Sequence, residues 1–168
     1  DLAKTYNLLP QYRKEKVDHF RFIKDKKLSC GAYLLLKKML DDENISNPIF
    51  KTGKFGKSYI SNHENIHFNL SHSGKIVACG ISDKPIGVDV EYTDPEIDLD
   101  KEKNYFFNTE YDRIMNSNDP PNEFFKYWVL KESYMKYTGL GFQLDLNSFE
   151  IVIGKEITLK NNNNNLKF

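Results

Sequence analysis

Apolar and polar residues alternate with a period of two over residues 86–91, whose sequence is IGVDVE. This period is typical of a half-buried β-strand, in which alternate side chains point to opposite faces. Asp89 and Glu91 would then share one face, with roughly 7 Å between their Cα atoms. Two adjacent carboxylates repel each other unless water, a proton or a cation separates them. The acidic pair therefore belongs either to a solvated strand face or to a cation site.

A helix is predicted over residues 122–137. Pro120 and Pro121 break the chain before it, and Asn122 is a candidate N-cap. No Gly or Pro interrupts the stretch up to Gly139, which offers a C-terminal stop.

Charged residues continue the apolar stripe of this helix. Phe125, Trp128 and Val129 follow helical spacing, and the next turns carry Glu132 and then Lys136. Charged groups are costly to bury unless they are paired or bound to something. One interpretation is an exposed i, i+4 ion pair worth a few tenths of a kcal/mol. The other combines Glu132 with the acidic pair of the strand into a site for a hard cation such as Mg²⁺.

The remaining pattern alternates helix and strand. We expect a helix at Leu28–Leu40, a hairpin of strands at Ile76–Ile81 and Ile86–Tyr92, a helix within residues 100–115, and a final hairpin of residues 149–153 and 156–159. The asparagine run at residues 161–165 is of low complexity and is expected to be a loop or tail.

Charge is distributed unevenly, although the formal net charge is zero. Residues 1–60 hold thirteen Lys and Arg against seven Asp and Glu, whereas residues 81–125 hold four against twelve. A basic half facing an acidic half suits a polyanionic small ligand that carries its own cation. A dedicated nucleic-acid-binding surface would need a stronger basic excess, so we expect no nucleic-acid partner.

Features of membrane, secreted and zinc proteins are missing from the sequence. No apolar run approaches the ~20 residues of a membrane span, and nothing resembles a signal peptide. Cys30 and Cys79 stand in apolar surroundings without a partner spacing, which is typical of free thiols in a reducing compartment. We therefore expect a cytoplasmic protein without zinc or membrane contact.

Five motifs occur in an order that resembles a known family. They are the segments around Pro10 to Lys16, Gly56-Lys57, FNLSHSG at 68–74, IGVDVE at 86–91 and WVLKESYMK at 128–136. The chain resembles the 4′-phosphopantetheinyl transferases, specifically the monomeric surfactin-synthetase-activating type, over about residues 10–149.

The resemblance implies an α+β fold of two lobes related by a pseudo-two-fold axis, with the active site in the cleft between them. We expect one domain over residues 1–168, with lobe one at about 1–84 and lobe two at about 85–168. Ser58 stands where the family usually has Pro, and the chain starts without Met and lacks the family's outer strands. We accordingly expect both ends to be truncated.

The activity implied is transfer of the 4′-phosphopantetheine arm of coenzyme A to a serine of an apo acyl or peptidyl carrier protein, which releases 3′,5′-bisphosphoadenosine. Asp89, Glu91 and Glu132 would hold Mg²⁺, with Mn²⁺ as a substitute. Asp89, Glu132 and Lys136 would carry the chemistry. Glu132 would take the serine proton, directly or through a water, and Lys136 would stabilise the departing phosphate.

The resemblance also implies a set of coenzyme A contacts: Arg13, Lys16, Lys27, Ser29, Lys57, Ser71, His72, Lys131 and Lys136. Two other interpretations stay open. A Mg²⁺-dependent phosphohydrolase or nucleotidyltransferase could use the same carboxylates and would release phosphate without a carrier protein. A non-catalytic module would bind coenzyme A or a carrier protein without turnover.

Overall fold

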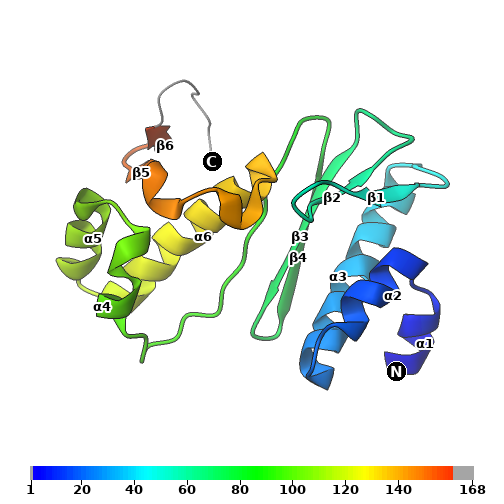
Figure 1. Ribbon diagram of the computed structural model, residues 1–168, viewed down its shortest axis with the longest axis horizontal. Coiled ribbons are helices and arrows are strands. Elements are labelled where there is room, and N and C mark those ends of the chain that lie inside the picture. The colour runs from blue at the N-terminus through cyan, green and yellow to red at the C-terminus, as the bar shows by residue number, and fades with distance from the viewer. Residues whose placement is uncertain (1, 161–168) are drawn as a thin grey trace.

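The computed structural model describes residues 2–160 and has a mixed α+β fold (Figure 1). The helices are α1 (Leu2–Asn7), α2 (Gln11–Asp18), α3 (Ile23–Asp42), α4 (Leu99–Glu102), α5 (Asn108–Met115) and α6 (Pro120–Thr138), with 3-10 turns η1 (Lys103–Tyr105), η2 (Gly141–Gln143) and η3 (Leu146–Ser148). The strands are β1 (Phe50–Thr52), β2 (Ser58–Ile60), β3 (His67–Ser73), β4 (Ile76–Ser82), β5 (Glu150–Ile153) and β6 (Ile157–Lys160). The asparagine run predicted to be a loop or tail lies outside the described residues.

The strands form three separate antiparallel hairpins, β1–β2, β3–β4 and β5–β6. The hairpin predicted near the end of the chain is confirmed as β5–β6, in which Ile151 lies opposite Leu159. The hairpin predicted over residues 76–92 is wrong, because β4 pairs with β3 instead, Ser71 opposite Ala78. Residues 86–92 are extended but form no strand with any described residue.

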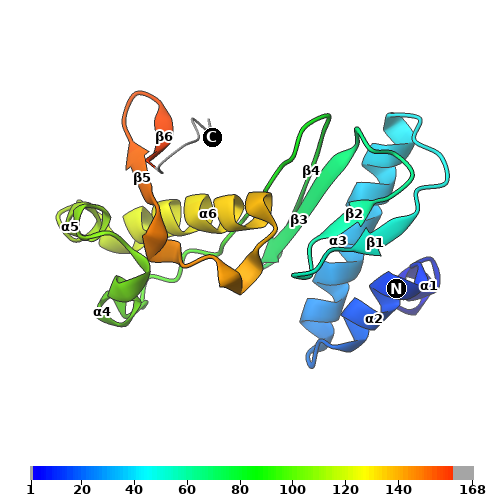
Figure 2. The same ribbon diagram turned by 45° about the horizontal axis from the view of Figure 1, so that its top comes forward.

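Helix α3 packs along the β3–β4 hairpin with one side, and α1 and α2 contact the other side of α3 (Figures 1 and 2). The helix predicted at Leu28–Leu40 is confirmed and is longer, because it begins at Ile23. Its apolar face closes two buried clusters, one with Val17 and one with Phe68. These clusters make α2, α3 and β3 one packed unit.

Helix α6 forms the centre of the second half of the molecule (Figure 2). It begins at Pro120, two residues before the predicted start, and its N-cap is Asp119, whose carboxylate accepts a bond from Asn122 N. Gly139 ends the helix in the left-handed conformation, as predicted. Within 100–115 the single predicted helix is divided into α4 and α5.

The buried stripe of α6 differs from the predicted one by one residue. Phe124, Tyr127, Lys131 and Tyr134 are buried, whereas the predicted Phe125, Trp128 and Val129 are half-buried. A shift of one residue rotates the buried face of a helix by about 100°. The pattern of apolar residues did not indicate the true face, because that face includes the charged Lys131.

Among the described residues no helix is both long enough and apolar enough to cross a membrane.

Candidate functional site

Alternate side chains of β3 hold the extended segment 86–92 in place. The amides of Val88, Val90 and Tyr92 donate to the side-chain oxygens of Asn69 (2.8 Å), Ser71 (3.3 Å) and Ser73 (3.0 Å). Side chains two residues apart lie on the same face of a strand, which gives them the spacing of successive inward amides of the segment. We call Asn69, Ser71 and Ser73 the β3 side-chain ladder. Because it satisfies these amides, the segment runs extended beside β3 without a backbone sheet ladder.

The same ladder orients the two carboxylates of the segment. Ser71 donates its hydroxyl to Asp89 (2.8 Å), and Ser73 donates to Glu91 (2.7 Å). Lys136 of α6 completes this cluster, since its ammonium lies 2.5 Å from Asp89 Oδ1 and donates to Ser71 Oγ at 3.0 Å. The Asp89 side chain is 1% exposed, yet its Oδ2 has no hydrogen-bond partner among the described residues. A buried acceptor oxygen without a partner is costly.

Glu132 faces this cluster from α6. Burial raises the pKa of its carboxyl, and the neighbouring charges of Asp89 and Glu91 raise that pKa further, while Lys136 opposes them. Asp89 and Glu91 are thus near enough to Glu132 for their charges to act on it. Within residues 2–160, however, no three His, Cys, Asp or Glu side chains are close enough to form a metal-binding cluster.

Close backbone contact brings segment 86–92 against α6. A Cβ atom on Gly87 would overlap the carbonyl oxygen of Ser133 and the amide nitrogen of Tyr137. Only glycine permits this approach. Lys57 strengthens the same junction, because its ammonium donates to the carbonyl oxygens of Ile86 (2.9 Å) and Tyr137 (3.0 Å).

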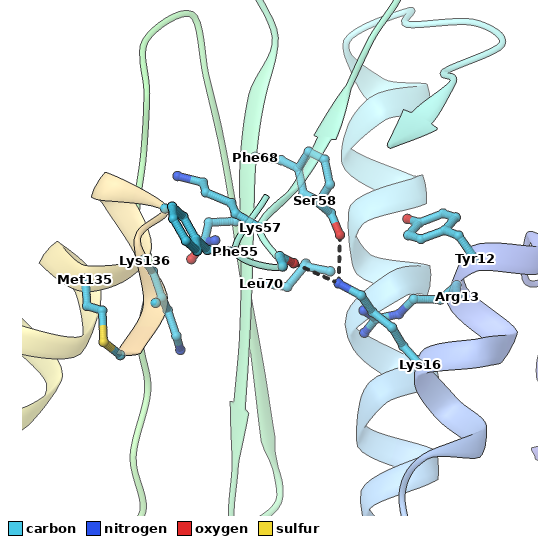
Figure 3. A pocket seen from close by; sticks show the side chains of 14 residues that line it. Tyr12, Arg13, Lys16, Phe55, Lys57, Ser58, Phe68, Leu70, Met135 and Lys136 are labelled. Atoms are coloured by element: carbon cyan, nitrogen blue, oxygen red, sulfur yellow. Dashed lines mark hydrogen bonds between the residues drawn. The ribbon is translucent and has the colours of Figure 1, made fainter. Parts of the chain in front are cut away.

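A basic cavity opens on the other side of β3 (Figure 3). It consists of two adjoining hollows, of about 240 and 340 Å³, that share Arg13, Lys16 and Leu70. Figure 3 shows residues of α2 and the end of α6 approaching it from opposite sides. Lys136 lines the first hollow and His72 the second, so the cavity adjoins the carboxylate cluster.

The cations of this cavity are only partly satisfied. Arg13 is 8% exposed and donates through Nη2 to Ser29 O at 2.9 Å, but its buried Nε has no partner among the described residues. Lys16 donates to Ser58 Oγ at 2.8 Å. Burial lowers the pKa of Arg13, Lys16 and His72, and the Arg13 charge lowers the last two further. Several desolvated cations around one cavity provide a site for a polyanion.

The residues predicted to bind coenzyme A separate into four groups, of which Lys131 forms the last. Arg13, Lys16, Ser29, Lys57, His72 and Lys136 line the basic cavity. Lys27 does not, because it lines a different hollow beside Cys30 and Gly31. Ser71 is 6% exposed and its hydroxyl is bonded to Asp89, so its observed contacts position that carboxylate.

Lys131 cannot contact a bound nucleotide in this structure, which corrects its predicted role. Its side chain is 0% exposed and pairs with Glu110 at 2.9 Å, and it also donates to the carbonyl oxygens of Leu146 and Phe149. Burial lowers the pKa of Lys131, while the Glu110 charge opposes that shift. Its position on the buried stripe of α6 directs it into the core.

Sequence reasoning missed Asn69, Ser73 and Glu110. The period of two in the ladder could have indicated the first two residues, since all three ladder side chains are short and polar on one strand face. Glu110 gave no such signal, because its partner is 21 residues away in the sequence.

Comparison with known proteins identifies the family. The model of the 4′-phosphopantetheinyl transferase superfamily matches residues 85–167. The 4′-phosphopantetheinyl transferase gsp of Aneurinibacillus migulanus is 36% identical over 125 residues, which cover 72% of this chain and 52% of that protein. The chain belongs to the 4′-phosphopantetheinyl transferase superfamily.

Further superfamily members show the same similarity. Sfp of Bacillus subtilis (strain 168) is 38% identical over 104 residues, 61% of this chain and 46% of that protein. The transferase ffp of Bacillus subtilis is 31% identical over 144 residues, 83% of this chain and 64% of that protein. The chain spans about half the length of the first curated relatives that it matches.

Proposed function

We propose that this chain transfers the 4′-phosphopantetheine arm of coenzyme A to a serine of an apo carrier protein. The observation that carries the proposal is the position of the Asp89–Lys136 pair, with Glu132 beside it, at the edge of the basic cavity. A pyrophosphate donor needs cations along its phosphates and a carboxylate near the bond that breaks. This arrangement offers both.

The proposed architecture has two lobes related by a pseudo-two-fold axis, one at about residues 1–84 and the other at about 85–168. The buried residues support the division, because those of α2, α3, β2 and β3 form two clusters and those of α5, α6, β5 and β6 form another. The cleft between the lobes would then hold the active site. Since one chain supplies both sides of the basic cavity, a single copy would suffice.

A divalent cation suits the charges of Asp89, Glu91 and Glu132, although the three acids would have to move closer together to share it. Asp89 Oδ2 is a buried oxygen without a partner, and the like charges around Glu132 favour a cation between the acids. Asp89, Glu91 and Glu132 would hold Mg²⁺, or Mn²⁺ in its place. The bound cation would neutralise charge on the donor pyrophosphate.

Coenzyme A would bind with its phosphates in the basic cavity. Arg13, Lys16 and His72 would contact the 3′-phosphate region, since all three surround the second hollow. Lys57 lines the first hollow, and its positive charge would attract the phosphates of coenzyme A there. Its ammonium already donates to two carbonyl oxygens.

The proposed reaction is one displacement at phosphorus. The serine Oγ of the carrier attacks the phosphorus that bears the pantetheine arm, and the bond from that phosphorus to the bridging oxygen breaks. Glu132 accepts the serine proton, directly or through a water. Lys136 stabilises the negative charge on the departing 3′,5′-bisphosphoadenosine.

The free thiols of Cys30 and Cys79 support a cytoplasmic location for this reaction.

Intact-protein mass spectrometry tests the proposal directly. Apo acyl carrier protein, coenzyme A, Mg²⁺ and this chain are incubated together, and the carrier mass should rise by one phosphopantetheine arm. EDTA or Glu132→Gln should prevent the gain. Coenzyme A binding without any gain would instead indicate a non-catalytic module, and phosphate release without a carrier would indicate a hydrolase. If the carrier gains no mass and the chain does not bind coenzyme A, the proposal is overturned.

A further inference from the structure

Lys57 joins three parts of the chain that are far apart in the sequence. It lies at the end of the turn between β1 and β2, and its ammonium donates to the carbonyl oxygens of Ile86 at 2.9 Å and Tyr137 at 3.0 Å. A lysine ammonium has three donor protons. Two of them therefore serve the backbone of the protein itself, which attraction of a phosphate would not require.

Hydrogen bonds within the first half of the chain hold the turn that carries Lys57. Gly53 N donates to Lys57 O at 2.8 Å, and Gly56, whose φ of 91° is in the left-handed region, donates to Gly53 O at 3.0 Å. Lys16 of α2 donates to Ser58 Oγ at 2.8 Å and to Gly56 O at 3.4 Å (Figure 3). The backbone of Lys57 is thus fixed on one side of the basic cavity, while its ammonium bonds to elements on the other side.

The end of α6 has room for this side chain because Gly139 follows the helix. A Cβ atom on Gly139 would lie 3.1 Å from Lys57 Cδ, so the lysine stem passes directly over the glycine. The last carbonyl groups of a helix lack partners within it, and the helix dipole favours a cation beside them. Tyr137 O is one of these groups. Lys57 therefore caps α6 from a different element.

The two carbonyl groups that Lys57 binds are close in sequence to the Asp89–Lys136 pair. Tyr137 directly follows Lys136, and Ile86 precedes Asp89 by three residues. One ammonium thus holds both backbones a few residues from the point where Asp89 Oδ1 and Lys136 Nζ lie 2.5 Å apart. A relative shift of the two backbones would change that distance.

We propose that Lys57 is a positioning residue, which sets the separation of segment 86–92 and α6 and thereby the contact between Asp89 and Lys136. Its consequence for catalysis rests on the proposed function, whereas the bonds to the two backbones are observed. A displacement of about 1 Å in a reacting group can slow a reaction about 10²-fold. Lys57 therefore acts on the rate through Asp89 and Lys136, in addition to any attraction of the donor.

The first test is Lys57→Met, which keeps an unbranched stem but removes the ammonium. The matched control is Lys54→Met, since Lys54 is an exposed lysine of the same turn whose ammonium lies 5.1 Å from the centre of the Phe55 ring. With coenzyme A, Mg²⁺ and apo acyl carrier protein all saturating, kcat should fall about tenfold or more in Lys57→Met and stay unchanged in Lys54→Met. A raised coenzyme A Kd with an unchanged kcat would make Lys57 a donor contact alone and would overturn the proposal.

A double-mutant cycle tests whether Lys57 acts through Asp89. Single-turnover rates are compared for Lys57→Met, Asp89→Asn and the combined variant. If Lys57 positions Asp89, adding Lys57→Met to Asp89→Asn should slow transfer by less than about threefold, because the contact that Lys57 maintains is already altered. Two effects that multiply in full would show that Lys57 acts independently of Asp89 and would also overturn the proposal.

Hydrogen exchange of the free protein separates failure of this inference from failure of the proposed activity, because it needs no turnover. Amides of residues 86–92 and 133–139 should exchange about tenfold faster in Lys57→Met than in the native chain and in Lys54→Met, since local opening reduces protection. An increase confined to these two stretches supports the positioning role even if the native chain transfers nothing. Unchanged exchange, or an equal increase along the whole chain, overturns it.

Discussion

Two lysines of α6, five residues apart, each pair with a carboxylate from another element, and the two pairs are built differently. The Lys131–Glu110 pair is completely buried, with exposures of 0% and 1%. Lys131 has three oxygen partners, and Glu110 accepts from the amides of Phe107 and Ile151 as well. We call it the closed pair, because both of its charged groups are fully hydrogen-bonded.

The charged groups of the Lys136–Asp89 pair are not fully hydrogen-bonded. Lys136 is 27% exposed at the edge of the basic cavity, and Asp89 keeps one buried oxygen without a partner among the described residues. We call it the open pair. A saturated ion pair can only join elements, here α5, α6 and β5, whereas an unsaturated one can bind a ligand. The comparison therefore predicts that one pair governs stability and the other activity.

Removal of the closed pair should have the largest effect. Lys131→Met leaves the Glu110 carboxylate buried without its cation, so the free energy of unfolding should fall by about 3–5 kcal/mol. Urea denaturation followed by circular dichroism measures it. Lys126→Met removes an exposed lysine of the same helix that pairs with Glu123, and it should cost less than about 1 kcal/mol. Equal losses in the two variants would contradict the distinction.

Alteration of the open pair should instead reduce the rate. Asp89→Asn keeps the shape of the side chain but removes its charge, so transfer to the carrier should slow by about 10²-fold or more. The free energy of unfolding should change by no more than about 1 kcal/mol, because Lys136 remains partly exposed. Single-turnover mass spectrometry gives the rate. A normal rate would remove Asp89 from the reaction, and a matching loss of stability would make the pair structural.

The ladder beneath the open pair should tune its cation affinity. Ser73→Ala removes the hydroxyl that orients Glu91, and the Kd for Mn²⁺ should rise about tenfold, as for other residues that orient a metal ligand. Titration of the free protein followed by electron paramagnetic resonance measures this without turnover. Ser61→Ala deletes a hydroxyl that donates to the Ile49 carbonyl and should leave the Kd unchanged. An unchanged Kd in Ser73→Ala would show that the ladder shapes only the backbone.

The smallest expected effect concerns the pH dependence of stability. Burial and the Arg13 charge lower the pKa of His72, so the folded state takes up a proton less readily than the unfolded chain. The stability contribution is therefore present above the unfolded pKa of about 6.5 and is lost as pH falls below it. His72→Gln should reduce the loss in unfolding free energy between pH 8 and pH 5.5, by less than about 1 kcal/mol after solvent screening. Parallel pH profiles of the two proteins would contradict this assignment.

Part of the fold could be predicted from local patterns. The helix at Leu28–Leu40, the end of α6 at Gly139 and the β5–β6 hairpin were all correct, because their signals lie within a few residues of one another. The predicted partner of β4 was wrong, because residues 67–73 and 86–92 are both close to β4 in sequence and either could have paired with it. The choice depended on the ladder, whose side chains occupy the amides that a second sheet pairing would need.

The same division holds for the site. Its motifs predicted Asp89, Glu91, Glu132 and Lys136 as site residues, because spacing along a strand or helix determines which side chains share a face. The sequence by itself therefore determined the family and the chemical groups available. Only the tertiary structure decided that Lys131 enters the core, that Lys27 lies outside the basic cavity and that Gly87 meets α6. These outcomes depend on packing between elements distant in sequence, where a one-residue rotation of a helix or the approach of a second backbone changes what each side chain contacts.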